Sequence, residues 1–228
     1  MKAIMFDFDG TLTIKSPNIW KAIWQNLGYE TGKGSYFSRL FIMFLTKDIT
    51  HQKWCDLTCE KFMEKGLHKD LVKEITKQIN LNNGAKETFE TLKNMGYSLN
   101  IVSGNFTSVI KEVLGENVKY FDSINANELI YDENGFVTGI KGTNYDFEGK
   151  AHFINEFKDT HNIPAKNIYF VGNGDNDEWA HLSGCKTLCV NPENTDITNK
   201  TKWHNAIESV TDLTQILPYF DDDSQMDN

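Results

Sequence analysis

The sequence predicts an α/β protein with a doubly wound, mostly parallel sheet, an inserted helical cap and a small β-hairpin. Short apolar runs that end in polar, glycine-containing stretches lie at residues 4–13, 97–105 and 167–177. Each is typical of a buried strand that opens into a loop. Helical periodicity separates the later runs, as parallel strands require. Residues 16–79 show helical spacing without the alternation of strands, which predicts the inserted cap.

The predicted cap contains four helices. The first has Pro17 near its start and Gly28 at its stop, and the third has Thr50 as its N-cap and Gly66 as its stop. The second is an aromatic and apolar segment, and the fourth is short. We expect these helices at residues 17–28, 36–45, 51–65 and 69–79.

Strand and helix patterns alternate from residue 83 onward. Residues 128–131 and 136–140 flank Asp132-Glu133-Asn134-Gly135, whose Asn-Gly pair predicts a hairpin turn. The sheet domain then comprises residues 1–15 and 80–220, with the cap at 16–79 and a disordered acidic tail at 221–228. We expect helices at 85–94, 106–114, 150–160, 178–182 and 213–217, and further strands at 97–102, 123–126, 167–171 and 187–190.

The composition is that of a soluble globular protein, with 39% hydrophobic and 24% charged residues. A net charge of −9 argues against nucleic-acid binding, and it repels anionic substrates unless a cation offsets it. No apolar run has the length of a signal peptide or a membrane span, so we expect a cytoplasmic protein without a membrane partner. The four cysteines are expected to be reduced core residues. The oligomeric state is not predicted.

Two carboxylates, Asp7 and Asp9, end the first apolar run. Carboxylates this close repel each other unless a cation or a shared proton lies between them, which indicates Mg²⁺ or a shared proton. The alternative is a solvated Asp-Gly turn. Since ligands bind outside the carboxyl ends of parallel strands, we expect the loops after the other strands to join this pair.

Those loops carry complementary groups. Ser103 and the Gly104 amide follow the second strand, residues 173–177 follow the third, and Lys150 supplies a cation between them. Together with Asp7 and Asp9 they form a set suited to phosphate-ester cleavage: a carboxylate nucleophile, an acid and base, and donors to the phosphoryl oxygens. Lysine and Mg²⁺ would balance the charge of the transition state.

These four motifs, in this order, resemble those of haloacid dehalogenase superfamily phosphatases, in the branch similar to phosphoserine phosphatases. The resemblance covers nearly the whole chain except the tail, and it implies a Rossmann-like core and a cap that closes over the site. It implies that Asp7 is the nucleophile, that Asp9 is the general acid and base, and that both bind Mg²⁺, Asp9 through its backbone carbonyl. Ser103 and Lys150 would hold the phosphoryl group, and Asp177 would belong to the metal site. The other candidate contacts with substrate or phosphate are Thr11, Gly104, Asn105, Asn176 and Arg39.

Two positions depart from the pattern of that branch. Asn173 stands where a metal-binding aspartate is usual, so we expect weaker Mg²⁺ affinity, with Asp175 as the alternative ligand. Ser16 stands where phosphoserine phosphatases carry a glutamate that binds the substrate's amino group, which argues against phosphoserine itself. Arg39, the single arginine of the chain, is a candidate clamp for a carboxylate or second phosphate, or else a surface residue.

We therefore expect a Mg²⁺-dependent phosphomonoesterase that acts on a small phosphorylated metabolite through an aspartyl-phosphate on Asp7. One alternative is a phosphotransferase of the same fold. Another is a non-catalytic phosphate-sensing module such as a phospho-receiver, which the cap after the first strand disfavours.

Overall fold

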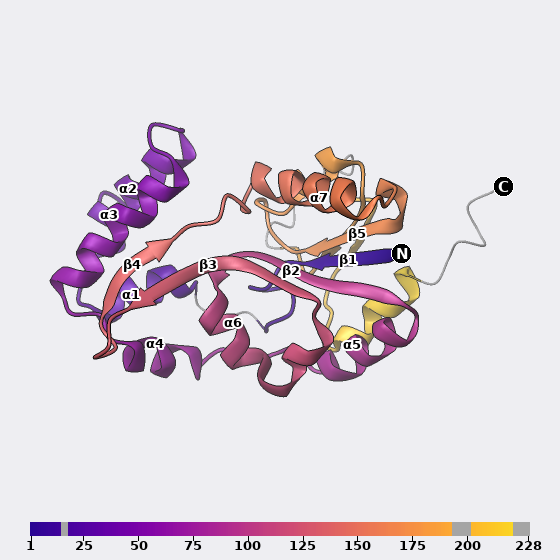
Figure 1. The fold of residues 1–228 in the computed structure, drawn as a ribbon, viewed down its shortest axis with the longest axis horizontal. Helices are drawn as coiled ribbons and strands as arrows, with labels where there is room; N and C mark the ends of the chain where they lie inside the picture. Colours follow the sequence, from indigo (N-terminus) through magenta and orange to yellow (C-terminus); the bar gives the residue numbers. More distant parts are fainter. Residues whose placement is uncertain (15–17, 193–201, 221–228) are drawn as a thin grey trace.

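The computed structural model describes residues 1–14, 18–192 and 202–220. Its sheet has seven strands in the order β4-β3-β2-β1-β5-β6-β7, and every neighbouring pair is parallel except β3 and β4 (Figure 1). The predicted fold class is confirmed. The strands are β1 (Lys2–Phe6), β2 (Tyr97–Phe106), β3 (Ser123–Tyr131), β4 (Val137–Lys141), β5 (Ile168–Gly172), β6 (Lys186–Val190) and β7 (Asn205–Ile207).

Helices cover both faces of the sheet, with α5 (Ala85–Asn94) and α6 (Thr107–Leu114) on one face and α7 (Glu148–His161) on the other (Figure 1). The central strand β1 is therefore buried on both sides: Ile4 and Phe6 pack in the larger core with Phe89 of α5, while Met5 packs with Ile154 of α7. This burial explains why β1 is a continuous apolar run rather than an alternating one.

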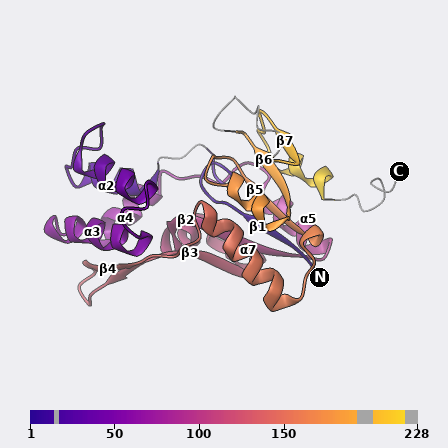
Figure 2. The ribbon, with the colours of Figure 1, turned by 90° about the horizontal axis from the view of Figure 1, so that it is seen from above.

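Residues 19–76 are helical, as expected, and lie at one end of the sheet, beside β4 (Figure 2). Thr50 caps α3 by accepting from the Lys53 backbone N–H. Gln52 joins α3 to the hairpin by accepting from Gly142 N at 2.8 Å and donating to Ile140 O at 2.9 Å. The division into core and cap domains stays a prediction, and the tail at 221–228 lies outside the described residues. The helices are α1 (Ile19–Asn26), α2 (Tyr36–Leu45), α3 (His51–Glu64) and α4 (Lys69–Thr76).

Two strands differ from the expected ones. β2 continues through residues 103–105 to Phe106 instead of ending in a loop, because its register against β3 shifts between Val102 and Phe106. Residues 103–105 thus form an irregular, bulged stretch, which keeps polar groups at the carboxyl end of the strand. β3 is one strand rather than two, since its first half pairs with β2 and its second half with β4.

Other differences concern short elements. Glu178–Ser183 and Leu213–Tyr219 are 3₁₀ helices, and β7 was not expected from the sequence. In the described part of the chain, no helix has both the length and the apolar character needed to cross a membrane.

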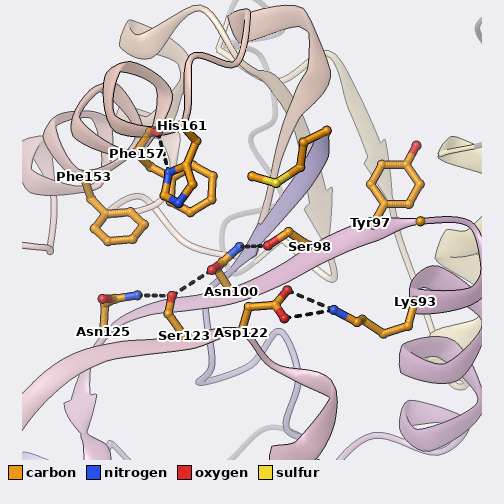
Figure 3. A pocket seen from close by; sticks show the side chains of 12 residues that line it. Lys93, Tyr97, Ser98, Asn100, Asp122, Ser123, Asn125, Phe153, Phe157 and His161 are labelled. Atoms are coloured by element: carbon orange, nitrogen blue, oxygen red, sulfur yellow. Dashed lines mark hydrogen bonds and ion pairs between the residues drawn. The ribbon is translucent and has the colours of Figure 1, made fainter.

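A cavity of about 610 Å³ lies at the amino ends of β2 and β3, against α7 (Figure 3). Phe153, Phe157 and His161 form one wall. The opposite wall is a row of polar side chains on the two strands, which hydrogen-bond to one another from Asn125 through Ser123 to Asn100 (Figure 3). The carboxyl ends of the strands, where Asp7 lies, are at the other edge of the sheet.

Candidate active site

Asp7 and Lys150 form the buried centre of the site. The Asp7 backbone N–H donates to Val171 O at 2.8 Å, which extends the pairing of β1 with β5. Asp7 is 4% exposed and accepts at Oδ1 from the Lys150 ammonium at 2.7 Å. Lys150 is fully buried in the first turn of α7. The turn requires Gly149, since a Cβ at that position would lie 1.5 Å from Asn144 O.

Asp177 is the second partner of Lys150. Its Oδ1 accepts from the Lys150 ammonium, and its Oδ2 accepts from the backbone N–H groups of Asn173 at 2.8 Å and Gly174 at 3.0 Å. A Cβ at Gly172 would lie 2.5 Å from the Asp177 carboxyl carbon. The last residue of β5 must therefore be glycine for the Asp177 carboxylate to lie against the end of the strand. Asp177 therefore holds both the loop after β5 and the lysine.

The charges of this centre are not balanced. Burial raises the pKa of Asp7 well above its ordinary value of 3.8, and Asp177 and Asp9 raise it further against the opposing effect of Lys150. Burial lowers the pKa of Lys150, but Asp177 and Asp7 outweigh it and raise the pKa above its ordinary value, so the ammonium stays charged. Lys150 thus lies among the carboxylates of Asp7, Asp177 and Asp146, and Asp9 adds a further negative charge beside Asp7. An ionised Asp7 is favoured by further positive charge nearby.

Asp9 lies at the more open side of the site and is half-buried. Asn105, 1% exposed on the bulge of β2, donates from Nδ2 to both Asp9 oxygens at 3.1 and 2.9 Å. Ser103 is also 1% exposed, and its hydroxyl accepts from Asn105 N at 3.3 Å. At Gly104 a Cβ would meet Asp146 Oδ2 at 2.8 Å, which explains the glycine.

The groups available to a metal ion are all oxygens. Asn173 is 7% exposed, its amide oxygen accepts from Thr11 Oγ1 at 3.2 Å, and its amide nitrogen packs against Gly10. It thus lies beside the loop that carries Asp9, whereas Asp175 is exposed. Oxygen donors of this kind fit Mg²⁺. Within the described ranges no cluster of three or more His, Cys, Asp or Glu residues suited to a metal ion is found.

The structure brings together most of the residues predicted for the site. Thr11 contacts Asn173. Asn176 lies at the edge of the site and donates to Asp146 Oδ1 at 2.8 Å. Arg39 is different: it is exposed, and its guanidinium donates to Gly34 O at 3.1 Å within its own turn. Ser16 lies outside the described residues.

Three residues around the site were not singled out from the sequence. Asp146, which contacts Asn176, carried no sequence signal. Asn127 donates to Gly104 O at 2.7 Å from within β3. Trp20 Nε1 donates to the same carbonyl at 2.8 Å.

The model of the haloacid dehalogenase-like hydrolase family matches residues 4–178. The chain therefore belongs to the haloacid dehalogenase-like hydrolases, in agreement with its fold and with the order of its motifs.

Curated relatives bear the name phosphoserine phosphatase. The chain is 33% identical to that of Archaeoglobus fulgidus over 180 residues, which is 77% of this chain but 48% of the relative. It thus spans about half the length of that protein. It is 29% identical over 227 residues to the phosphoserine phosphatase of Methanocaldococcus jannaschii, covering 96% of this chain and 97% of the relative.

Solved structures share the fold. A substrate-bound phosphoserine phosphatase complex superposes with a TM-score of 0.71 at 23% identity, over 96% of this chain and 97% of the other. A phospho-aspartyl intermediate analogue of phosphoserine phosphatase gives 0.70 at 24% identity, over 96% and 98%.

Proposed function

We propose that this protein is a Mg²⁺-dependent phosphomonoesterase that hydrolyses a small phosphorylated metabolite through an aspartyl-phosphate on Asp7. The observation that carries the proposal is the buried Asp7–Lys150–Asp177 centre at the carboxyl end of β1, with Asp9 two residues from Asp7. A nucleophile next to a fixed cation and a second, more accessible carboxylate form the arrangement that stepwise phosphoryl transfer requires. The names of the relatives support the same chemistry.

In the first step, a carboxylate oxygen of Asp7 attacks phosphorus, the bond from phosphorus to the leaving oxygen breaks, and Asp9 donates a proton to that oxygen. In the second step, Asp9 takes a proton from a water molecule that attacks the phosphorus of the aspartyl-phosphate, and Asp7 is regenerated as a carboxylate. The Ser103 hydroxyl, the Gly104 N–H and the Lys150 ammonium face the phosphoryl oxygens and stabilise their charge.

Mg²⁺, when bound, would supply the positive charge that Lys150 alone cannot provide against the carboxylates of the site and a phosphate dianion. The residues that would hold it are Asp7, the Asp9 backbone carbonyl and Asn173. Asp177 was predicted for the same metal site, but both its oxygens already accept hydrogen bonds. We therefore propose that Asp177 contributes mainly by orienting Lys150 and the loop.

The substrate is proposed at the level of its class, a small phosphate monoester. We propose that the substrate enters the site from the side lined by Asp9, Gly104 and Asn176, which are each partly exposed. The exposed guanidinium of Arg39 does not support the clamp that was predicted from the sequence. We further propose a cytoplasmic protein without nucleic-acid or membrane partners.

A panel of phosphorylated metabolites, including phosphoserine and phosphorylated sugars and alcohols, assayed with Mg²⁺ and with EDTA, tests the proposal. We expect phosphate release from at least one monoester, dependent on Mg²⁺ and absent in Asp7→Asn. Product analysis with added alcohols separates a phosphatase from a phosphotransferase, which would form new esters in preference to phosphate. No turnover of any monoester would favour the phosphate-sensing module. That module is the second candidate because a neutral amide, Asn173, stands where a carboxylate is usual in the metal site.

A further inference from the structure

The side chain of Asn105 is held in one orientation and faces the proposed acid. Its Oδ1 accepts from the Phe106 backbone N–H at 2.5 Å, which directs Nδ2 away from the strand and toward Asp9. From there Nδ2 lies 2.9 and 3.1 Å from the two Asp9 oxygens. Asn105 is 1% exposed whereas Asp9 is half-buried. A buried amide therefore hydrogen-bonds to a carboxylate that remains partly accessible to solvent.

The backbone that carries Asn105 is itself fixed from the neighbouring strand. Asn127 is fully buried, and its Nδ2 donates to Gly104 O at 2.7 Å and to Asn105 O at 3.3 Å. Its Oδ1 accepts from Thr143 N at 2.8 Å, in the segment that follows the hairpin. Because β2 is bulged here and its ladder with β3 is interrupted, these side-chain bonds replace the missing backbone pairing.

We propose that Asn105, braced by Asn127, is a positioning residue for Asp9: it holds the carboxyl group in the orientation that delivers a proton to the leaving oxygen. This inference rests on the proposed function. Proton delivery requires the donor to lie within hydrogen-bond reach of the leaving atom and in a suitable rotamer. The amide of Asn105 restricts Asp9 before the substrate arrives, without contacting the substrate itself.

The test compares two substrates that differ in their need for an acid. The alkoxide of an alkyl phosphate is a poor leaving group and needs protonation as it departs. The p-nitrophenolate of p-nitrophenyl phosphate departs readily without it. In Asn105→Ala we expect the rate of the first step, phosphorylation of Asp7 measured in a single turnover, to fall about 10- to 100-fold for the alkyl phosphate and less than about threefold for p-nitrophenyl phosphate. Asn105→Ser serves as a second variant should the alanine protein fold poorly.

Asn125→Ala is the matched control. Asn125 lies on the same strand as Asn127, but its side chain bonds to Ser123 and to Ile101 O at the cavity of Figure 3. The control is expected to retain both rates. A double-mutant cycle adds an independent measure: once Asp9→Asn has removed the acid, adding Asn105→Ala should lower the single-turnover phosphorylation rate with the alkyl phosphate by less than about twofold.

Equal losses for the two substrates, or additive losses in the cycle, would overturn the inference and leave Asn105 as a structural residue. If the wild-type protein hydrolyses neither substrate, nor any other monoester, the proposed function fails first. Rates measured well below the melting temperature of each variant separate these outcomes from unfolding.

Discussion

Replacement of Lys150 by methionine is the perturbation whose consequences the structure defines most fully. The ammonium is fully buried between Asp7 and Asp177, so its removal leaves two buried carboxylates without a counter-charge. Breaking a buried ion pair by removing one partner costs about 3–5 kcal/mol of the free energy of unfolding. For a chain of this size this corresponds to a melting temperature roughly 6–20 °C lower. Activity should be lost as well, because in the proposed function Lys150 binds the phosphoryl group.

The assay is urea unfolding in EDTA near neutral pH and again near pH 5. The loss should shrink at the lower pH, because Asp7, whose pKa is already raised, takes up a proton and ceases to be an uncompensated charge. The double variant Lys150→Met/Asp7→Asn should regain part of the stability for the same reason. Lys158→Met, on the same helix but bonded only to Asn155 in the described contacts, should change the free energy by less than about 0.5 kcal/mol. A loss below about 1 kcal/mol, or one independent of pH, would refute the charge balance described here.

Three further predictions concern Asp7, the amide at position 173 and Arg39. Because the pKa of Asp7 is raised in the folded protein, ionisation of Asp7 costs stability. In EDTA, the free energy of unfolding of the wild type should therefore fall relative to that of Asp7→Asn as the pH rises above 3.8 and through the raised pKa. Parallel pH profiles of the two proteins would contradict this. Asn173→Asp should tighten Mg²⁺ binding, measured by calorimetry, whereas Asp175→Asn should change the Mg²⁺ affinity by less than about twofold, because Asp175 is exposed. A large loss of affinity in Asp175→Asn alone would show that Asp175 is the ligand. Arg39→Lys should leave the Michaelis constant of every accepted ester unchanged, since the guanidinium contacts Gly34, and an increase of tenfold or more would restore the clamp.

The sequence predicted the parts of the fold and site that follow from strand topology. Asp7 and the loop that carries Asp177 were placed together because apolar runs ending in polar stretches bring their ends to one edge of a parallel sheet. Lys150 was included as a cation between the strands, and the roles of Lys150 and Asp177 came from the family resemblance. The bounds of α2 agree with those expected from its aromatic and apolar character, and the bounds of α5 with those expected from the helical pattern at 85–94.

Interactions that depend on local register were not predicted. Asn105 was expected to contact phosphate, but a bulge in β2 turns its side chain toward Asp9. The contacts of Asn127 and Asp146 depend on the same bulge and on the segment before α7, and no periodicity in the sequence encodes either. Arg39 was considered for its chemistry alone, which does not determine where a side chain on a peripheral helix lies.

The central claim is that Asp7 becomes phosphorylated during turnover. Borohydride trapping during steady-state hydrolysis, followed by mass spectrometry of the peptide that contains residue 7, tests it most directly, because the reagent reduces an acyl phosphate to an alcohol. We predict homoserine at position 7, with more of it in Asp9→Asn if the activation of water is slowed, and none at position 9. Turnover with an unmodified Asp7, or a reduced side chain at another aspartate, would contradict the account.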